Sequence, residues 1–232
     1  MEGSLVAYKV FTNGSVLQAS EINDNLMRQA VMVFSNSAAR TAAITLPLAG
    51  MLTYLEDVGL YETYTGTSWV SPFSFTLIKS QVIGTAVSSV IVTDAFSANF
   101  DNYKIMVSGG VGSVAQNIGL RLGGAATGYY AGGTDTTYSS AAVAGANVNN
   151  GASWTFAGVM NTTGIHFNVE LLNPFLTTRT TFSCARPSLA TNQGAIQASG
   201  FLNDATSYNN FTLLPAGTLT GGTISVYGFR KA

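Results

Sequence analysis

From about residue 75 to the C-terminus, short apolar stretches alternate with clusters of Gly, Asn, Asp and Thr. In one of them, Ile165, Phe167 and Val169 alternate with polar residues, which is the two-residue period of a half-buried strand. This regular series predicts a mainly β chain whose second part is an antiparallel β-sandwich of the jelly-roll type. The expected strands cover residues 87–93, 103–108, 117–122, 153–160, 164–172, 178–184, 194–201, 209–214 and 223–229.

Residues 123–152 break this pattern, because Gly, Ala, Ser, Thr and Asn dominate them and Asp135 is their only charge. So little apolar material predicts one or two long surface loops. Aromatic rings displayed on loops can stack on the faces of sugars or anchor protein contacts. The candidate binding residues are therefore Tyr129, Tyr130, Tyr138 and Trp154. For Trp154, the alternative is a place in the core of a strand.

Residues 1–72 are organised differently and are expected to form a small N-terminal α+β domain, followed by the sandwich at 73–232. A helix is predicted over 20–34, because Ser20 can cap its first turn and apolar residues such as Ile22 recur at helical spacing. The other expected elements are a strand at 4–11, a short helix at 37–43, and a hairpin formed by 51–56 and 60–64.

Charged residues make up only 9% of the chain, against roughly 25% in an ordinary soluble domain. Catalysis needs titratable groups set against one another, and this chain has one His (His166) and one Cys (Cys184). A cluster of His or Cys ligands within one chain is therefore excluded. We expect Cys184 to be buried and His166 to lie on a solvated strand face. The sequence thus predicts no catalytic residues, no metal site and no cofactor.

The ten Lys and Arg residues are scattered singly, whereas binding to nucleic-acid phosphates needs them clustered. No apolar run reaches the ~18 residues of a membrane span, and no signal peptide is visible. We therefore expect no nucleic-acid partner and no membrane insertion, and synthesis in a cytoplasm. A net charge of −1 gives little repulsion between copies, which suits a subunit of an assembly.

Several runs resemble bacteriophage tail proteins. Residues 16–27 (VLQASEINDNLM), 50–57 (GMLTYLED) and 64–69 (YTGTSW) resemble, in order and spacing, the attachment segment of minor tail proteins and tail fibres. Residues 83–90 (IGTAVSSV) and 222–230 (GTISVYGFR) resemble the first and last parts of the β-sandwich tips of the same proteins.

The resemblance implies a virion protein, made in the host cytoplasm and usually a homotrimer. Residues 1–72 would attach to other tail or baseplate proteins, and residues 73–232 would contact the host cell surface, with a cell-surface glycan as the expected ligand. The alternative is a head fibre, collar or capsid decoration protein without receptor binding. A polysaccharide depolymerase is a further alternative, but the chain has few carboxylates that could act in catalysis. A non-viral carbohydrate-binding module is another, but it would not explain the N-terminal segment.

Overall fold

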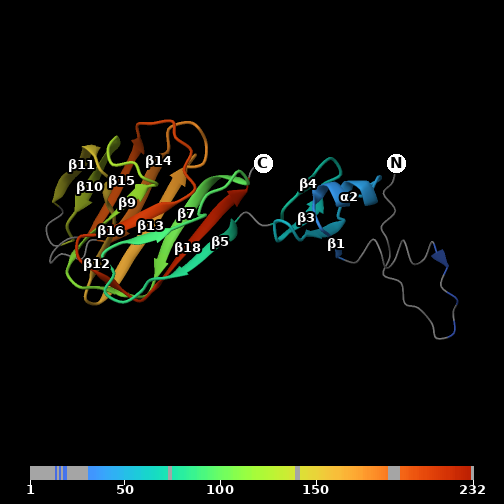
Figure 1. Ribbon diagram of the computed structural model, residues 1–232, viewed down its shortest axis with the longest axis horizontal. Coiled ribbons are helices and arrows are strands. Elements are labelled where there is room, and N and C mark those ends of the chain that lie inside the picture. The colour runs from blue at the N-terminus through green and yellow to red at the C-terminus, as the bar shows by residue number, and fades with distance from the viewer. Residues whose placement is uncertain are drawn as a thin grey trace. The chain divides into compact units, whose positions relative to one another are not determined.

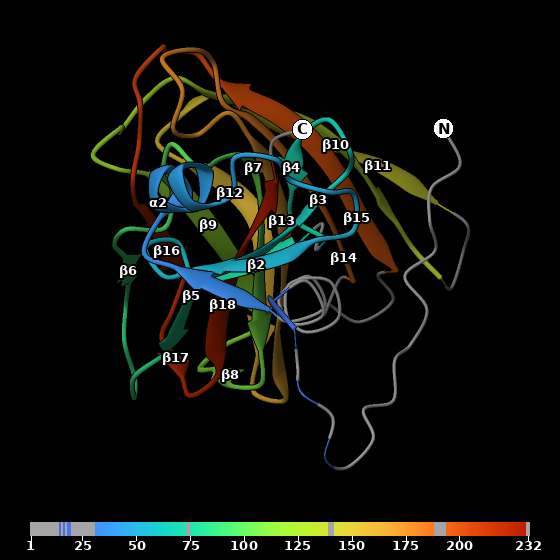
Figure 2. The same ribbon diagram turned by 90° about the vertical axis from the view of Figure 1, so that its right-hand side faces the viewer.

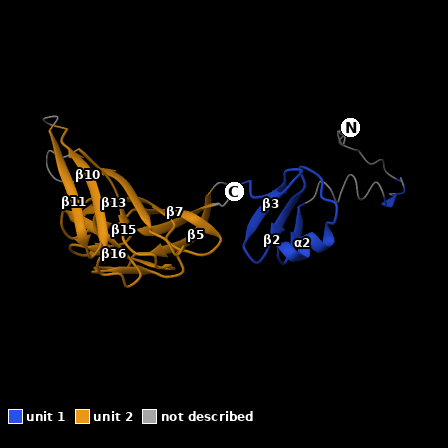
Figure 3. Cartoon of the chain, turned by 90° about the horizontal axis from the view of Figure 1, so that it is seen from above, with its two compact units in different colours: residues 1–74, 232 blue, residues 75–231 orange. Residues whose placement is uncertain are grey.

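A computed structural model describes residues 14, 16, 18, 19, 31–72, 75–138, 142–187 and 194–230. The chain divides into two compact units, residues 1–74 with 232 and residues 75–231 (Figure 3). The boundary expected from the sequence fell between residues 72 and 73. Each unit is described by itself below.

In unit 1, the described residues from 31 onward form a small sheet with strand order β1-β2-β3-β4 and the short helix α2 (Figure 1). Strands β1 and β2 are parallel, and the other neighbours are antiparallel. The predicted helix at 37–43 and the predicted hairpin are confirmed. Asn36 caps the helix by accepting a hydrogen bond from the Ala39 backbone N–H. The elements are β1 (Met32–Phe34), α2 (Ser37–Ala43), β2 (Leu52–Leu55), β3 (Leu60–Tyr64) and β4 (Trp69–Val70).

The helix predicted over 20–34 is wrong at its C-terminal end, because Met32–Phe34 forms strand β1. There Val33 pairs with Tyr54 of β2, so backbone pairing in the sheet overrides the helical spacing of the apolar residues. Residues 20–30 and the strand predicted at 4–11 lie outside the described residues.

A buried ion pair joins the helix of unit 1 to its sheet. Arg40 of α2 and Glu62 of β3 are both 7% exposed, and the Arg40 guanidinium bonds the Glu62 carboxylate. The same guanidinium lies over the Trp69 ring, 4.7 Å from its centroid. These contacts hold α2 against β3 and β4.

Unit 2 is an antiparallel β-sandwich, as predicted (Figure 1). Its larger layer has the order β5-β18-β7-β13-β14-β15-β10-β11, and its smaller layer the order β12-β9-β16-β6. Strand β13 joins the two layers, since Ile165 pairs with Met160 of β12 whereas Leu171 pairs with Phe182 of β14. Neighbours far apart in sequence, such as β6 with β16 and β7 with β13, are typical of jelly rolls.

The strands of the larger layer are β5 (Phe75–Val82), β18 (Thr223–Arg230), β7 (Phe100–Ser108), β13 (Gly164–Leu172), β14 (Thr181–Pro187), β15 (Ala195–Leu202), β10 (Tyr129–Thr136) and β11 (Val143–Gly151). Those of the smaller layer are β12 (Trp154–Asn161), β9 (Gln116–Leu122), β16 (Phe211–Pro215) and β6 (Val90–Val92). Strands β8 (Val111–Gly112) and β17 (Leu219–Thr220) form a separate short pair.

The core between the layers is built around aromatic side chains. The Trp154 ring stacks on Phe182 with centroids 4.7 Å apart, and Tyr129 meets Trp154 edge-on at 4.9 Å. All three side chains are at most 2% exposed. The Tyr129 hydroxyl accepts a hydrogen bond of 2.8 Å from the Leu122 backbone N–H, so it links β10 to β9.

The long loops predicted for 123–152 are wrong, because most of this stretch forms the hairpin of β10 and β11 beside β15 (Figure 2). Its glycines serve close approach between strands. A Cβ at Gly133 would lie 2.4 Å from the Gln197 carbonyl oxygen, and one at Gly200 would lie 2.0 Å from that of Tyr130. Small residues therefore allow β10 and β15 to pair where larger ones would clash.

Candidate functional site

The outer face of the larger layer carries a row of short side chains across four neighbouring strands. Because side chains alternate between the two faces of a strand, these residues point away from the core. Three of the four are Gly or Ser, so they form a low floor. Opposite one another along this row lie Gly132 of β10, Ser199 of β15, Ser183 of β14 and Glu170 of β13.

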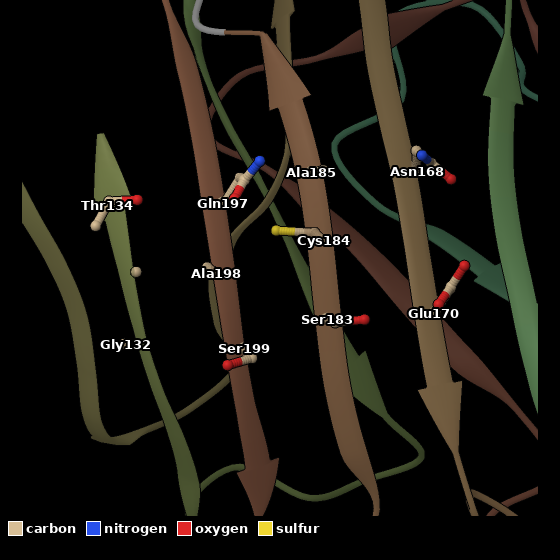
Figure 4. A pocket seen from close by; sticks show the side chains of 11 residues that line it. Gly132, Thr134, Asn168, Glu170, Ser183, Cys184, Ala185, Gln197, Ala198 and Ser199 are labelled. Atoms are coloured by element: carbon tan, nitrogen blue, oxygen red, sulfur yellow. The ribbon is translucent and has the colours of Figure 1, made fainter. Parts of the chain in front are cut away.

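Taller polar side chains rise beside this floor and enclose a depression of about 530 Å³. Thr134 pairs with Gln197 in the adjacent row, and Asn168 lies two residues before Glu170 on β13. Figure 4 shows Gln197 and Asn168 on either side of Ala185, on strands β15 and β13. Because hydroxyl and amide groups line it, the depression can exchange hydrogen bonds with a polar ligand.

The opposite side of the floor is bordered by an aromatic ridge. Tyr130 and Phe201 pair across β10 and β15, and their rings stack at 5.3 Å with an interplanar angle of 21°. The guanidinium carbon of Arg179 lies 5.2 Å from the centroid of the Phe201 ring. The Phe201 ring is thus packed against both Tyr130 and Arg179, and this ridge forms a wall beside the floor.

Two groups on β13 define the electrostatics of the depression. The Glu170 carboxylate is partly exposed, and its Oε1 lies 3.4 Å from the Lys104 ammonium on β7, a surface pair that contributes little to stability. The Oδ1 atom of Asn168 is buried and has no hydrogen-bond partner within the protein. None of the described residues that line the depression is Lys, Arg or His. The lining is therefore polar, with one carboxylate and no cation.

Beneath the depression, a buried guanidinium ties the two layers together. Arg186 is 4% exposed, and it donates to the Phe156 carbonyl at 3.0 Å and to Asn117 Oδ1 at 2.8 Å. Removal from water lowers its pKa, an effect partly offset by Cys184 and Asp135. This residue positions β14 against β12 and β9, a structural role that the sequence did not indicate.

Cys184 is buried, as expected, and burial raises the pKa of its thiol. His166 is exposed on β13, also as expected. Among the described residues, no three His, Cys, Asp or Glu side chains are grouped so that they could hold a metal ion.

The four aromatic residues proposed from the sequence do not form one surface site, because Tyr129 and Trp154 pack against each other in the core. Tyr129 and Trp154 are fully buried, so their predicted display on the surface is wrong and the core alternative holds for Trp154. Tyr130 lies in the aromatic ridge beside the depression, and Tyr138 is 75% exposed, two residues beyond the end of β10. A buried ring cannot stack on a ligand, so only Tyr130 and Tyr138 remain candidates.

No motif in the sequence marks the polar residues of the depression, although most lie in strands that the sequence predicts correctly. Alternation within 164–172 and 194–201 assigns Asn168, Glu170 and Gln197 to polar faces. These residues become neighbours because the strands lie in the order β13-β14-β15-β10, and the local sequence does not predict that order.

Comparison with protein-family models, curated proteins and solved structures found no match. No helix in the described ranges is long and apolar enough to cross a bilayer.

Proposed function

We propose that this chain is a bacteriophage virion protein of the tail fibre or minor tail type. Its N-terminal unit attaches to other tail or baseplate proteins, and its β-sandwich contacts the host cell surface. The protein acts by binding, without a catalytic step, and assembles as a homotrimer in the virion.

The observation that carries the proposal is a polar, solvent-open depression on a β-sandwich that forms a compact unit. Gly132, Gln197 and Ser199 are exposed there, so a ligand can reach the sheet directly. The sandwich and the N-terminal unit are each compact units of their own, which suits a division between attachment and recognition.

The runs that resemble tail proteins add support in unit 1. Residues 50–57 and 64–69 belong to one compact module, in which Tyr64 and Trp69 pack at 5.2 Å between ring centroids. Gly66 takes a φ of +102°, a conformation that favours glycine in the turn between these two rings. A tight module of this kind is a suitable particle anchor.

An adsorption competition tests the proposal. The purified full-length chain is added to bacteria infected by the particle that carries it, and free particles are then counted. We expect the chain to bind the cells and to slow adsorption in proportion to the sites it occupies. If the chain is present in purified particles but neither binds cells nor slows adsorption, it is a decoration or collar protein instead.

Light scattering after size exclusion tests the assembly separately. A trimeric mass for the full-length chain is expected. A monomeric mass at all concentrations would contradict the homotrimer. The proposed contact with the host cell would then be decided by the adsorption result alone.

A further inference from the structure

The depression on the larger layer combines a floor without bulky side chains with walls rich in hydrogen-bonding groups. Amides come from Asn168 and Gln197, and hydroxyls come from Thr134, Ser183 and Ser199. An apolar ligand would remove these groups from water without replacing their hydrogen bonds, which is unfavourable. The lining therefore matches a ligand with many polar groups of its own.

The charges of the depression narrow the class of ligand. Recognition of phosphate, sulfate or a polyanionic chain relies on Arg or Lys. The described residues lining the depression include Glu170 and no cation, and Lys104 beside it is paired with that carboxylate. A carboxylate accepts hydrogen bonds from hydroxyl groups and repels anions. A neutral ligand rich in hydroxyl groups fits this lining.

Asn168 adds a side-chain amide to the lining of the depression. Its Oδ1 atom is buried and unpaired within the protein, and buried polar atoms are rarely left so. A hydroxyl group both donates and accepts hydrogen bonds. It can therefore pair with the Asn168 side chain whether the amide oxygen or the amide nitrogen faces it. As part of the lining, the Asn168 amide is a group that a sugar hydroxyl can hydrogen-bond.

The dimensions indicate a chain rather than a single sugar. From Gly132 to Glu170 the row crosses four strands, and three interstrand steps of about 4.8 Å span roughly 14 Å. The Tyr130–Phe201 ridge borders this row on one side, and Thr134 and Gln197 border it on the other. The floor is thus a trough that runs across the strands.

We infer that this trough binds a stretch of neutral oligosaccharide lying across β10, β15, β14 and β13. Asn168, Glu170 and Gln197 hydrogen-bond its hydroxyl groups, and the short side chains at Gly132, Ser183 and Ser199 leave room for its rings. This inference rests on the proposed function and identifies the chemistry of the host ligand.

The probe is the envelope polysaccharide of the bacteria used for adsorption, freed of protein by protease. Anion exchange separates it into an unretained neutral fraction and a retained anionic fraction. Each fraction is immobilised, and binding of the full-length chain is measured by biolayer interferometry. We expect binding to the neutral fraction, and sensitivity of that binding to periodate, which cleaves vicinal diols.

Two variants test the position of the site. A Cβ at Gly132 meets no atom within 4 Å and its φ is not positive, so Gly132→Tyr fills the trough without strain in the strand. Asn168→Ala removes the amide while leaving the trough open. Each should weaken binding at least about tenfold, with thermal unfolding unchanged. Gly124→Tyr is the matched control, because Gly124 is equally open but lies outside the depression.

The other outcomes separate this inference from the proposed function. Binding to the anionic fraction alone, or to protease-sensitive material alone, overturns the neutral ligand while adsorption competition still supports adhesion. Binding to the neutral fraction that is unaffected by both variants places the site elsewhere and overturns the trough. Absence of binding to any fraction, together with unchanged adsorption, overturns both the inference and the proposed function.

Discussion

The Tyr129→Phe substitution removes the two hydrogen bonds of one core hydroxyl, which accepts from the Leu122 N–H and donates to the Leu122 carbonyl at 3.5 Å. The phenyl ring retains its edge-on contact with Trp154, and only the hydroxyl is lost. That hydroxyl accepts from the Leu122 N–H at 2.8 Å, and both residues are 0% exposed. The N–H would then remain buried without a partner, which costs about 1–3 kcal/mol. For a unit of this size each kcal/mol lowers the melting temperature by about 2–4 °C.

Tryptophan fluorescence can follow the unfolding of unit 2 alone. The chain has two tryptophans, Trp69 in unit 1 and Trp154 in unit 2, so a Trp69→Phe background leaves Trp154 as the single reporter. Urea unfolding of Tyr129→Phe in this background gives the change in the free energy of unfolding, provided that its dependence on urea concentration (the m-value) is unchanged. Tyr138→Phe is the control, because Tyr138 is 75% exposed and its substitution should change stability by less than about 0.5 kcal/mol.

Equal stability of Tyr129→Phe and Tyr138→Phe would refute this reasoning, because the buried hydrogen bonds would then contribute nothing. The same pair of variants tests whether Tyr129 is a core residue and not a ligand contact. If Tyr129→Phe left stability intact but weakened cell binding, Tyr129 would be a contact residue after all, and its burial in the core would be wrong.

Two further predictions concern packing and pH. Gly158→Ala places a Cβ 2.3 Å from Cδ2 of Phe167 and should cost about 1–3 kcal/mol in urea unfolding, whereas Gly145→Ala, with no atom within 4 Å, serves as the tolerant control. Burial, together with a hydrogen bond to Asp204, raises the pKa of Tyr208 from 10.0 to about 12. The folded state therefore holds this proton longer, so stability should fall as pH rises from 10 towards 12, and Tyr208→Phe should make that fall shallower.

The strands that the sequence predicts correctly are those that carry their own apolar face. In 164–172, buried Ile165, Phe167 and Val169 alternate with more exposed residues, so the pattern identifies both the strand and its orientation. Strand β10 lacks such a face, since Gly132 and Gly133 replace bulky residues at adjacent positions. Its strand structure depends on pairing with β15 and β11, which local composition does not encode.

The same limit explains the candidate site. Small and polar neighbours in sequence favour surface display for Tyr129 and leave Trp154 open between a binding loop and the core of a strand. Their neighbours in space are Leu122 and Phe182, which come from other strands. The polar residues of the trough likewise become neighbours only through strand order, so the site could be assembled only from the structure.

The strands under the trough separate stability from recognition. On β10, Tyr129 points into the core and Tyr130 lies in the ridge, while on β14, Phe182 is buried and Ser183 lies on the trough floor. Inward residues make the buried aromatic contacts and hydrogen bonds, whereas the outward residues of the trough floor, such as Gly132, Ser183 and Ser199, are short. Surface substitutions away from such contacts usually change stability by no more than about 0.5 kcal/mol. The outer face can therefore vary without loss of the fold, which the proposed contact with a variable host surface would require.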